Sequence, residues 1–169
     1  VHRATLADTG QDVAVKVLRP GIERAFRTDI DALYLIEQKV ELLSPASRRL
    51  RPMDVVRHFE GVVLGELDLR LESSAAAEFA ANTATDDGIA VPAPVWHLSG
   101  RRVMTMAWAE GVPMADNAAI DAAGHDRSVL ATRVLQLFLN HALRDGYFHA
   151  DMHQGNLKVS ARGDIVVFD

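Results

Sequence analysis

The sequence contains no cysteine among its 169 residues, which excludes disulfide bonds and thiolate metal sites. No apolar run approaches the roughly 20 residues that a membrane-spanning helix needs, and no secretory signal peptide is visible. Internal repeats and low-complexity tracts are absent as well. These absences favour a globular protein of a reducing compartment, and we expect a cytoplasmic location.

A marked excess of one charge is also lacking. Lysine and arginine total 18 against 23 acidic residues, a formal net charge of −5, and the arginines are scattered. Trp96 and Trp108 are not accompanied by a basic stripe, so we interpret them as core or interlobe packing rather than a base-stacking platform. Nucleic acid is therefore not expected as a partner.

The hydrophobic pattern of the first half predicts a strand pair followed by two helices. Residues 12–18 alternate in polarity, and the turn at residues 8–10 would pair them with residues 1–6. Apolar residues at helical spacing predict an amphipathic helix over residues 22–43. The chain is long enough for one domain or two small lobes.

A second, longer helix is expected after a basic loop. Asp54 would cap it, and it would continue through Glu66, Asp68 and Glu72 towards Phe79. Glycines within its first half weaken it by about 1 kcal/mol each relative to alanine.

The second half predicts strands around a third helix. Residues 95–98 and 102–108 read as a second hairpin. The third helix begins at an Asp126 cap, extends to Arg144 and ends at Gly146.

The chain closes on a strand pair, residues 157–160 and 164–168, and this element order predicts an α+β, two-lobed fold. A segment of linker character at residues 109–113 suggests the boundary. We therefore expect a small lobe with a helical insert over residues 1–110 and a partial large lobe over residues 111–169.

Lys16 lies on a strand whose other face is rich in valine, and a buried lysine is costly unless its charge is paired. The second helix offers three acids as partners. Glu66 and Asp68 are about 200° apart on a helical wheel, so they face different ways, and Glu72 follows six positions after Glu66. One acid would pair with Lys16; the plainer alternatives are a lysine that reaches water and a solvated acidic face.

Three polar residues near the end of the chain suggest phosphoryl-transfer chemistry. Asp151 is followed five positions later by Asn156, and Asp169 ends an apolar strand. Kinase-type enzymes use one carboxylate to orient the acceptor, and an amide with a second carboxylate to hold Mg²⁺ against nucleotide phosphates. Asp151 is then the catalytic-loop residue, and Asn156 with Asp169 the metal ligands.

The alternation of His149, Asp151 and His153 supports a rival hypothesis. In an extended segment these three side chains would share one face and could bind Zn²⁺ or Fe²⁺, as in a metallohydrolase. No second cluster of ligands accompanies them, so we interpret His149 as a structural residue that braces the loop.

Three motifs together resemble the UbiB family of atypical kinases, the aarF-domain or coenzyme Q kinase-like proteins. They are Val-Ala-Val-Lys-Val-Leu-Arg-Pro-Gly at residues 13–21, Glu66-Leu67-Asp68 with Glu72, and His-Ala-Asp-x-His-x-Gly-Asn-Leu at residues 149–157. The resemblance covers essentially the whole chain, which would represent the family's domain truncated at both ends.

The resemblance implies a protein-kinase-like fold that uses ATP and Mg²⁺. Lys16 would contact the nucleotide phosphates and Glu72 would be its ion-pair partner. Ala14 and Met106 would lie against the adenine, and Glu66 and Asp68 would form the family's Glu-x-Asp motif over the site. A link to quinone or isoprenoid lipid metabolism is also implied, with a membrane surface or lipid as a partner of the full-length protein.

Two alternatives stay open at this stage. A small-molecule phosphotransferase of the aminoglycoside or choline kinase type shares a similar catalytic loop, although the Arg-Pro-Gly and Glu-x-Asp elements count against it. A pseudokinase would keep the fold as a non-catalytic binding module. Whether the chain acts as an enzyme is open, because the family's nucleotide loop and most of its large lobe would lie outside residues 1–169.

Overall fold

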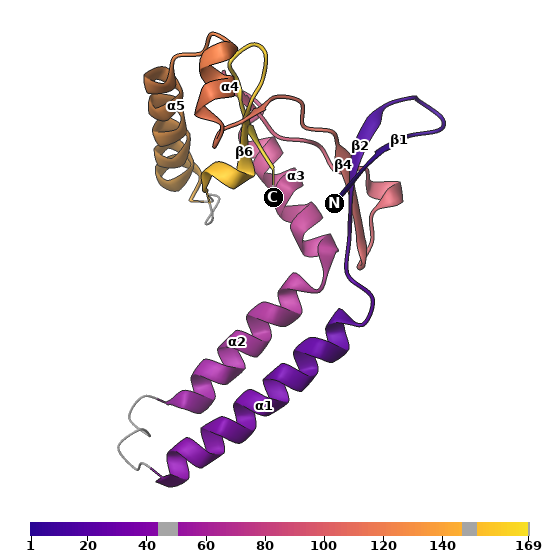
Figure 1. The fold of residues 1–169 in the computed structure, drawn as a ribbon, viewed down its shortest axis with the longest axis vertical. Coiled ribbons are helices and arrows are strands. Elements are labelled where there is room, and N and C mark those ends of the chain that lie inside the picture. Colours follow the sequence, from indigo (N-terminus) through magenta and orange to yellow (C-terminus); the bar gives the residue numbers. More distant parts are fainter. Residues whose placement is uncertain (44–50, 147–151, 169) are drawn as a thin grey trace.

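A helical hairpin projects from a pair of small β-sheets with helices around them (Figure 1). The structure, a computed structural model, describes residues 1–43, 51–146 and 152–168, and for residues 41–43 it describes the backbone alone. The two ends of the chain lie in the region between the sheets (Figure 1). This is the region where the sequence motifs were expected to meet.

The first sheet is antiparallel and has the order β1-β2-β4. Its strands are β1 (His2–Thr5), β2 (Asp12–Val17) and β4 (Val103–Ala107). The predicted hairpin of the first two strands is confirmed, and β4 pairs with residues 13–17 of β2. Lys16 therefore lies on the central strand of this sheet.

Helices α1 (Ile22–Leu43) and α2 (Pro52–Glu66) form the projecting hairpin. The amphipathic pattern explains their pairing, because Ile30 of α1 packs with Val63 and Leu67 in a small core of their own. The prediction of α1 is confirmed at both ends. The start of α2 was predicted wrongly: Arg51, at φ 49°, precedes Pro52 at the first helical position, and Asp54 already lies inside the first turn.

The second predicted helix is in fact two helices. It breaks between α2 and α3 (Leu69–Asn82), because the Asp68 carboxylate accepts a hydrogen bond from the Arg70 backbone N–H and so caps a new helix. The Leu67 and Leu69 side chains on either side of Asp68 are buried. The two helices meet at an elbow (Figure 1), which turns α3 back across the first sheet.

The second sheet has the order β3-β7-β6-β5. It comprises β3 (Ile89–Ala90), β5 (Val112–Pro113), β6 (Leu157–Val159) and β7 (Ile165–Val167). The predicted antiparallel pair of β6 and β7 is confirmed, whereas β3 and β5 were not predicted. β3 pairs in parallel with β7, so a strand from the expected small lobe contributes to the sheet of the expected large lobe.

Helices α4 (Asn117–Ala122) and α5 (Arg127–Asn140) cover the second sheet. Asp126 caps α5 as predicted by accepting hydrogen bonds from two backbone N–H groups. A π-helical turn, His141–Asp145, continues it to Gly146, whose positive φ of 64° ends the helix. The main core lies beneath these helices and is formed by Phe79, Ile120, Leu130, Leu137, Leu157, Val159, Ile165 and Val167.

The second predicted hairpin is only partly correct. Trp96–Leu98 forms a 3₁₀ turn instead of a strand, and Pro94 alone bridges to Met106 of β4. Trp96 is 55% exposed, so its interpretation as a core residue was wrong. Trp108 is half-buried at the junction between the two sheets.

Candidate active site: a lysine–glutamate pair in an interlobe cavity

A cavity of about 170 Å³ lies between the two sheets and collects several of the predicted site residues. It is lined by Val1, Ala14, Lys16, Glu72, Met106, Ala107, Trp108, Ala109, Lys158 and Phe168. The volume is below the roughly 300–1,000 Å³ of a typical small-molecule pocket. The cavity enclosed by the described residues is thus smaller than a typical small-molecule pocket.

Lys16 and Glu72 form the polar end of this cavity. The Lys16 ammonium donates a hydrogen bond of 2.8 Å to Glu72 Oε1. The two side chains are 31% and 27% exposed, so each charge has lost most of its contact with water. Of the three acids on the second predicted helix, Glu72 is thus the one that meets Lys16, because the break at Asp68 reorients α3 relative to α2.

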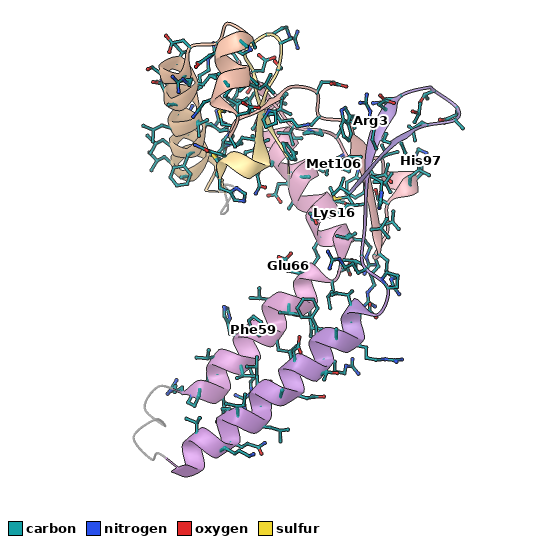
Figure 2. The ribbon with its side chains drawn as sticks, viewed as in Figure 1. Arg3, Lys16, Phe59, Glu66, His97 and Met106 are labelled. Atoms are coloured by element: carbon teal, nitrogen blue, oxygen red, sulfur yellow. The ribbon has the colours of Figure 1, made fainter. Side chains whose placement is uncertain are left out.

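Ala14 and Met106 form part of the apolar wall. They face one another across β2 and β4 in register, so both are fixed by the sheet. Figure 2 shows Lys16 and Met106 on these neighbouring strands. A ligand whose planar apolar ring lies against this wall would place an attached polar group at the Lys16–Glu72 pair.

Glu66 and Asp68 do not line the cavity. Glu66 ends α2 at the elbow (Figure 2), and its side chain is exposed. Asp68 caps α3 and also holds the Arg70 guanidinium at 2.6 Å, and this hydrogen bond lowers the pKa of Asp68 to about 2. Both residues lie at the joint between α2 and α3, and Asp68 is one helical turn before Glu72.

Asn156 ends the 3₁₀ turn Gln154–Asn156 directly before β6 and is half-buried. Its backbone carbonyl accepts a hydrogen bond of 3.1 Å from the Phe168 N–H, which brings it beside the residue that directly precedes Asp169 in the sequence. Asp151 and Asp169 themselves lie outside the described residues. The metal-binding role of Asn156 and Asp169 therefore stays a prediction.

The rival metal site is untested for the same reason. His149 and Asp151 lie outside the described ranges, and no group of three or more metal-ligating residues occurs within them. The His153 ring nitrogen Nδ1 accepts a hydrogen bond from the Gly155 N–H, 2.9 Å away. His153 thus shapes the turn that leads into Asn156.

Lys158 and Phe168 contribute to the cavity beside Trp108 and were missed as site residues. Lys158 was unremarkable because a lysine on an alternating strand is usually an exposed one. Its ammonium instead lies 5.1 Å from the Trp108 ring centroid and 5.4 Å from that of Phe168. The sequence signal that could have identified Lys158 was its position two residues after Asn156.

A buried polar network follows α5, directly before residues 147–151. The His141 side chain is 1% exposed, and its Nδ1 lies 2.6 Å from an Asp145 carboxylate oxygen. Arg144 donates hydrogen bonds to both Asp145 and Asp86. The Arg144 hydrogen bond, assisted by that of His141, lowers the pKa of Asp145 to about 2.

These features, a strand lysine paired with a helix glutamate at an interlobe cavity, define a kinase-like arrangement. The chain belongs to the ABC1 atypical kinase-like domain family, whose model matches residues 1–169. The family resemblance inferred from the motifs is therefore confirmed.

Curated relatives carry the name probable protein kinase UbiB. The protein from Marinobacter nauticus is 38% identical over 159 residues, and that from Azotobacter vinelandii is 40% identical over 162 residues. These matches cover 94% and 96% of this chain but only 29% and 30% of the relatives. The comparisons do not favour the aminoglycoside or choline kinase alternative.

A solved structure from Mycobacterium tuberculosis, described as the complex of Rv3197 with erythromycin, has a similar fold. It matches 99% of this chain and 41% of its own chain, with 28% identity and a TM-score of 0.82. The prediction of a kinase-like α+β fold is thus confirmed. Among the described residues, no helix combines the length and the apolar character needed to cross a bilayer.

Proposed function

We propose that this domain binds ATP with Mg²⁺ and supports phosphoryl transfer or ATP hydrolysis. The single observation that carries the proposal is the Lys16–Glu72 ion pair at the end of an apolar cavity. Lys16 would contact the nucleotide phosphates, and Glu72 would keep its ammonium directed into the cleft. The membership of an atypical kinase-like family supports this assignment.

The residues of the cavity fit a nucleotide in their chemistry. Ala14 and Met106 offer an apolar surface to a purine, and Lys16 offers a cation to the phosphates. In this proposal Asp151 orients the acceptor, while Asn156 and Asp169 hold Mg²⁺. The metal would neutralise charge on the phosphate oxygens. Oxygen ligands of this kind suit a hard divalent cation.

For the acceptor of the phosphoryl group we propose a class of molecule. The relatives' name suggests a role beside ubiquinone or other isoprenoid lipids, and the lipid or a membrane surface would be met by the full-length protein. Glu66 and Asp68, at the elbow between α2 and α3, would help the family-specific elements pack over the site. In this proposal residues 1–110 form the small lobe and residues 111–169 form part of the large lobe.

The test is ATP binding and Mg²⁺-dependent phosphate release by the full-length protein. Lys16→Met removes the ammonium and should reduce kcat/KM for ATP by about 100-fold or more, because it removes a charge-assisted contact made to the reacting phosphates. Asp169→Asn should abolish the Mg²⁺-dependent turnover of ATP with the fold intact.

A matched control exists within the chain. Lys39, on the exposed surface of α1, can be changed to methionine in the same way and should leave turnover within about twofold. Full turnover in Lys16→Met would refute the role of the strand lysine, and full turnover in Asp169→Asn would refute the metal assignment.

A further inference from the structure

One ammonium group connects three segments that border the cavity. Lys158 extends from β6, and its Nζ donates a hydrogen bond of 2.8 Å to the Ala109 carbonyl in the segment between the sheets. The same ammonium lies against the rings of Trp108 and Phe168. Lys158 thus joins the linker, β6 and the residue that follows β7.

A second contact fastens the same linker to the same strand. Gly111 has a φ of 137° and lies so close to β6 that an added Cβ would be 2.5 Å from the Val159 carbonyl oxygen. Val112 then pairs with Val159 as the chain enters β5. The linker is therefore attached to β6 at both Lys158 and Val159, and does not run free between the lobes.

Lys158 also differs from the neighbouring cation in the groups that compensate its charge. Arg3 contacts the Trp108 ring as well, at 4.8 Å, but its guanidinium is neutralised by Asp12. Among the described residues no carboxylate lies within ion-pair distance of Lys158, whose partners there are one carbonyl and two ring faces. A half-buried ammonium needs such partners, so Lys158 stays bound to the linker carbonyl. Loss of the ammonium would remove this contact and release the linker from β6.

We propose that Lys158 is a positioning residue of the nucleotide pocket: it clamps the linker between β4 and β5, residues 108–111, onto β6 and so holds Trp108 as one wall of the cavity. The strand that carries the clamp begins directly after Asn156, so the clamp also sets the distance between the adenine wall and the metal-binding end. This inference rests on the proposed function and deepens it.

The experiment compares Lys158→Met, Lys158→Arg and Lys39→Met in the full-length protein. These are the chain's lysines apart from Lys16, so the control has the same side-chain change outside the pocket. Lys158→Met should raise KM for ATP roughly tenfold, the effect of one lost charge-assisted hydrogen bond, with kcat changed by less than about twofold. Lys158→Arg should restore most of the affinity, and Lys39→Met should leave KM unchanged.

A second measurement separates a clamp from direct contact with the ligand. Hydrogen exchange of the amides at residues 108–111, without nucleotide, should be roughly tenfold faster in Lys158→Met than in the parent protein. Raised KM with unchanged exchange would overturn the clamp and make Lys158 a ligand contact. Unchanged KM would overturn the positioning role.

Failure of the proposed function gives a different result. If the parent protein neither binds nor hydrolyses ATP while Lys158→Met accelerates linker exchange, the clamp stands and the nucleotide assignment falls. If Lys158→Met does not accumulate as folded protein, Lys158→Gln removes the charge with a shorter polar side chain and is put through both measurements. If the linker amides of folded Lys158→Gln exchange as slowly as those of the parent protein, the clamp is overturned.

Discussion

Lys16 Nζ lies 2.8 Å from Glu72 Oε1, across 56 positions of sequence. The pair connects the central strand of the first sheet to α3, and it lies where the two sheets approach one another. Because both side chains are partly buried, removal of either partner would leave the other as an incompletely solvated charge. The pair is thus a coupled unit, which leads to the first prediction.

A double-mutant cycle should show strong coupling between these two side chains. We expect Lys16→Met and Glu72→Gln each to reduce kcat/KM for ATP in the full-length protein, and the double variant to be no worse than Lys16→Met alone. The reason is that Glu72 acts through the lysine it orients. Steady-state phosphate release measures all four proteins. Independent, multiplicative losses would show that Glu72 has a role apart from Lys16.

The close approach of Gly111 to β6 predicts a position-specific cost for alanine. Gly111→Ala should destabilise the fold by about 2 kcal/mol or more, because the new Cβ meets the Val159 carbonyl at a backbone φ that disfavours L-residues. Gly124→Ala is the matched control: its φ is 79° but its Cβ would meet nothing within 4 Å, so it should cost about 1 kcal/mol. Denaturant unfolding compares the two. Equal costs would mean that the linker is not packed tightly on β6.

A glycine in the hairpin offers the opposite effect. Gly61 lies on the exposed side of α2, and a Cβ there would contact nothing within 4 Å. Gly61→Ala should therefore stabilise the protein by about 0.5–1 kcal/mol through higher helix propensity. A rise in the midpoint of thermal unfolding tests this. A fall would show that the hairpin face at Gly61 is packed against a further segment in the full-length protein.

The sequence identified the parts of the site that depend on local pattern. Strand alternation placed Lys16, and the Asp126 cap and Gly146 correctly bounded the third helix and its π-helical end. The family resemblance supplied Glu72, since helical-wheel geometry alone could not choose among three acids on one continuous helix. The choice depended on the break at Asp68, where a side chain caps a new helix between two buried leucines.

Features that depend on long-range packing could not be predicted. β3 has two residues and exists because it pairs with β7, some 75 positions further on. Lys158 resembles any surface lysine until the fold brings the Ala109 carbonyl and two aromatic rings to it. The 3₁₀ turn at Trp96–Leu98 likewise replaces a strand, because this segment forms only isolated bridges to β4, at Pro94 and at Gly100.

The network after α5 predicts a specific acid sensitivity. The folded-state pKa of Asp145 is about 2, lowered chiefly by the Arg144 hydrogen bond, and lies below the roughly 3.9 of an unfolded aspartate. Its stabilising contribution is therefore complete above about pH 4 and is lost as the pH falls towards 2. The Asp86 pKa is lowered by the same guanidinium and acts in the same direction.

Removal of either side of this network should flatten the acid limb of the stability curve. We expect Asp145→Asn and Arg144→Met to lower stability at pH 7 and to lose less further stability between pH 4 and 2 than the parent protein, because each eliminates the depressed pKa of Asp145. Urea unfolding at intervals of pH measures the slope directly. An unchanged slope in both variants would mean that Arg144 does not hold Asp145 in solution, and the π-helical turn before residues 147–151 would then depend on apolar packing around His141 alone.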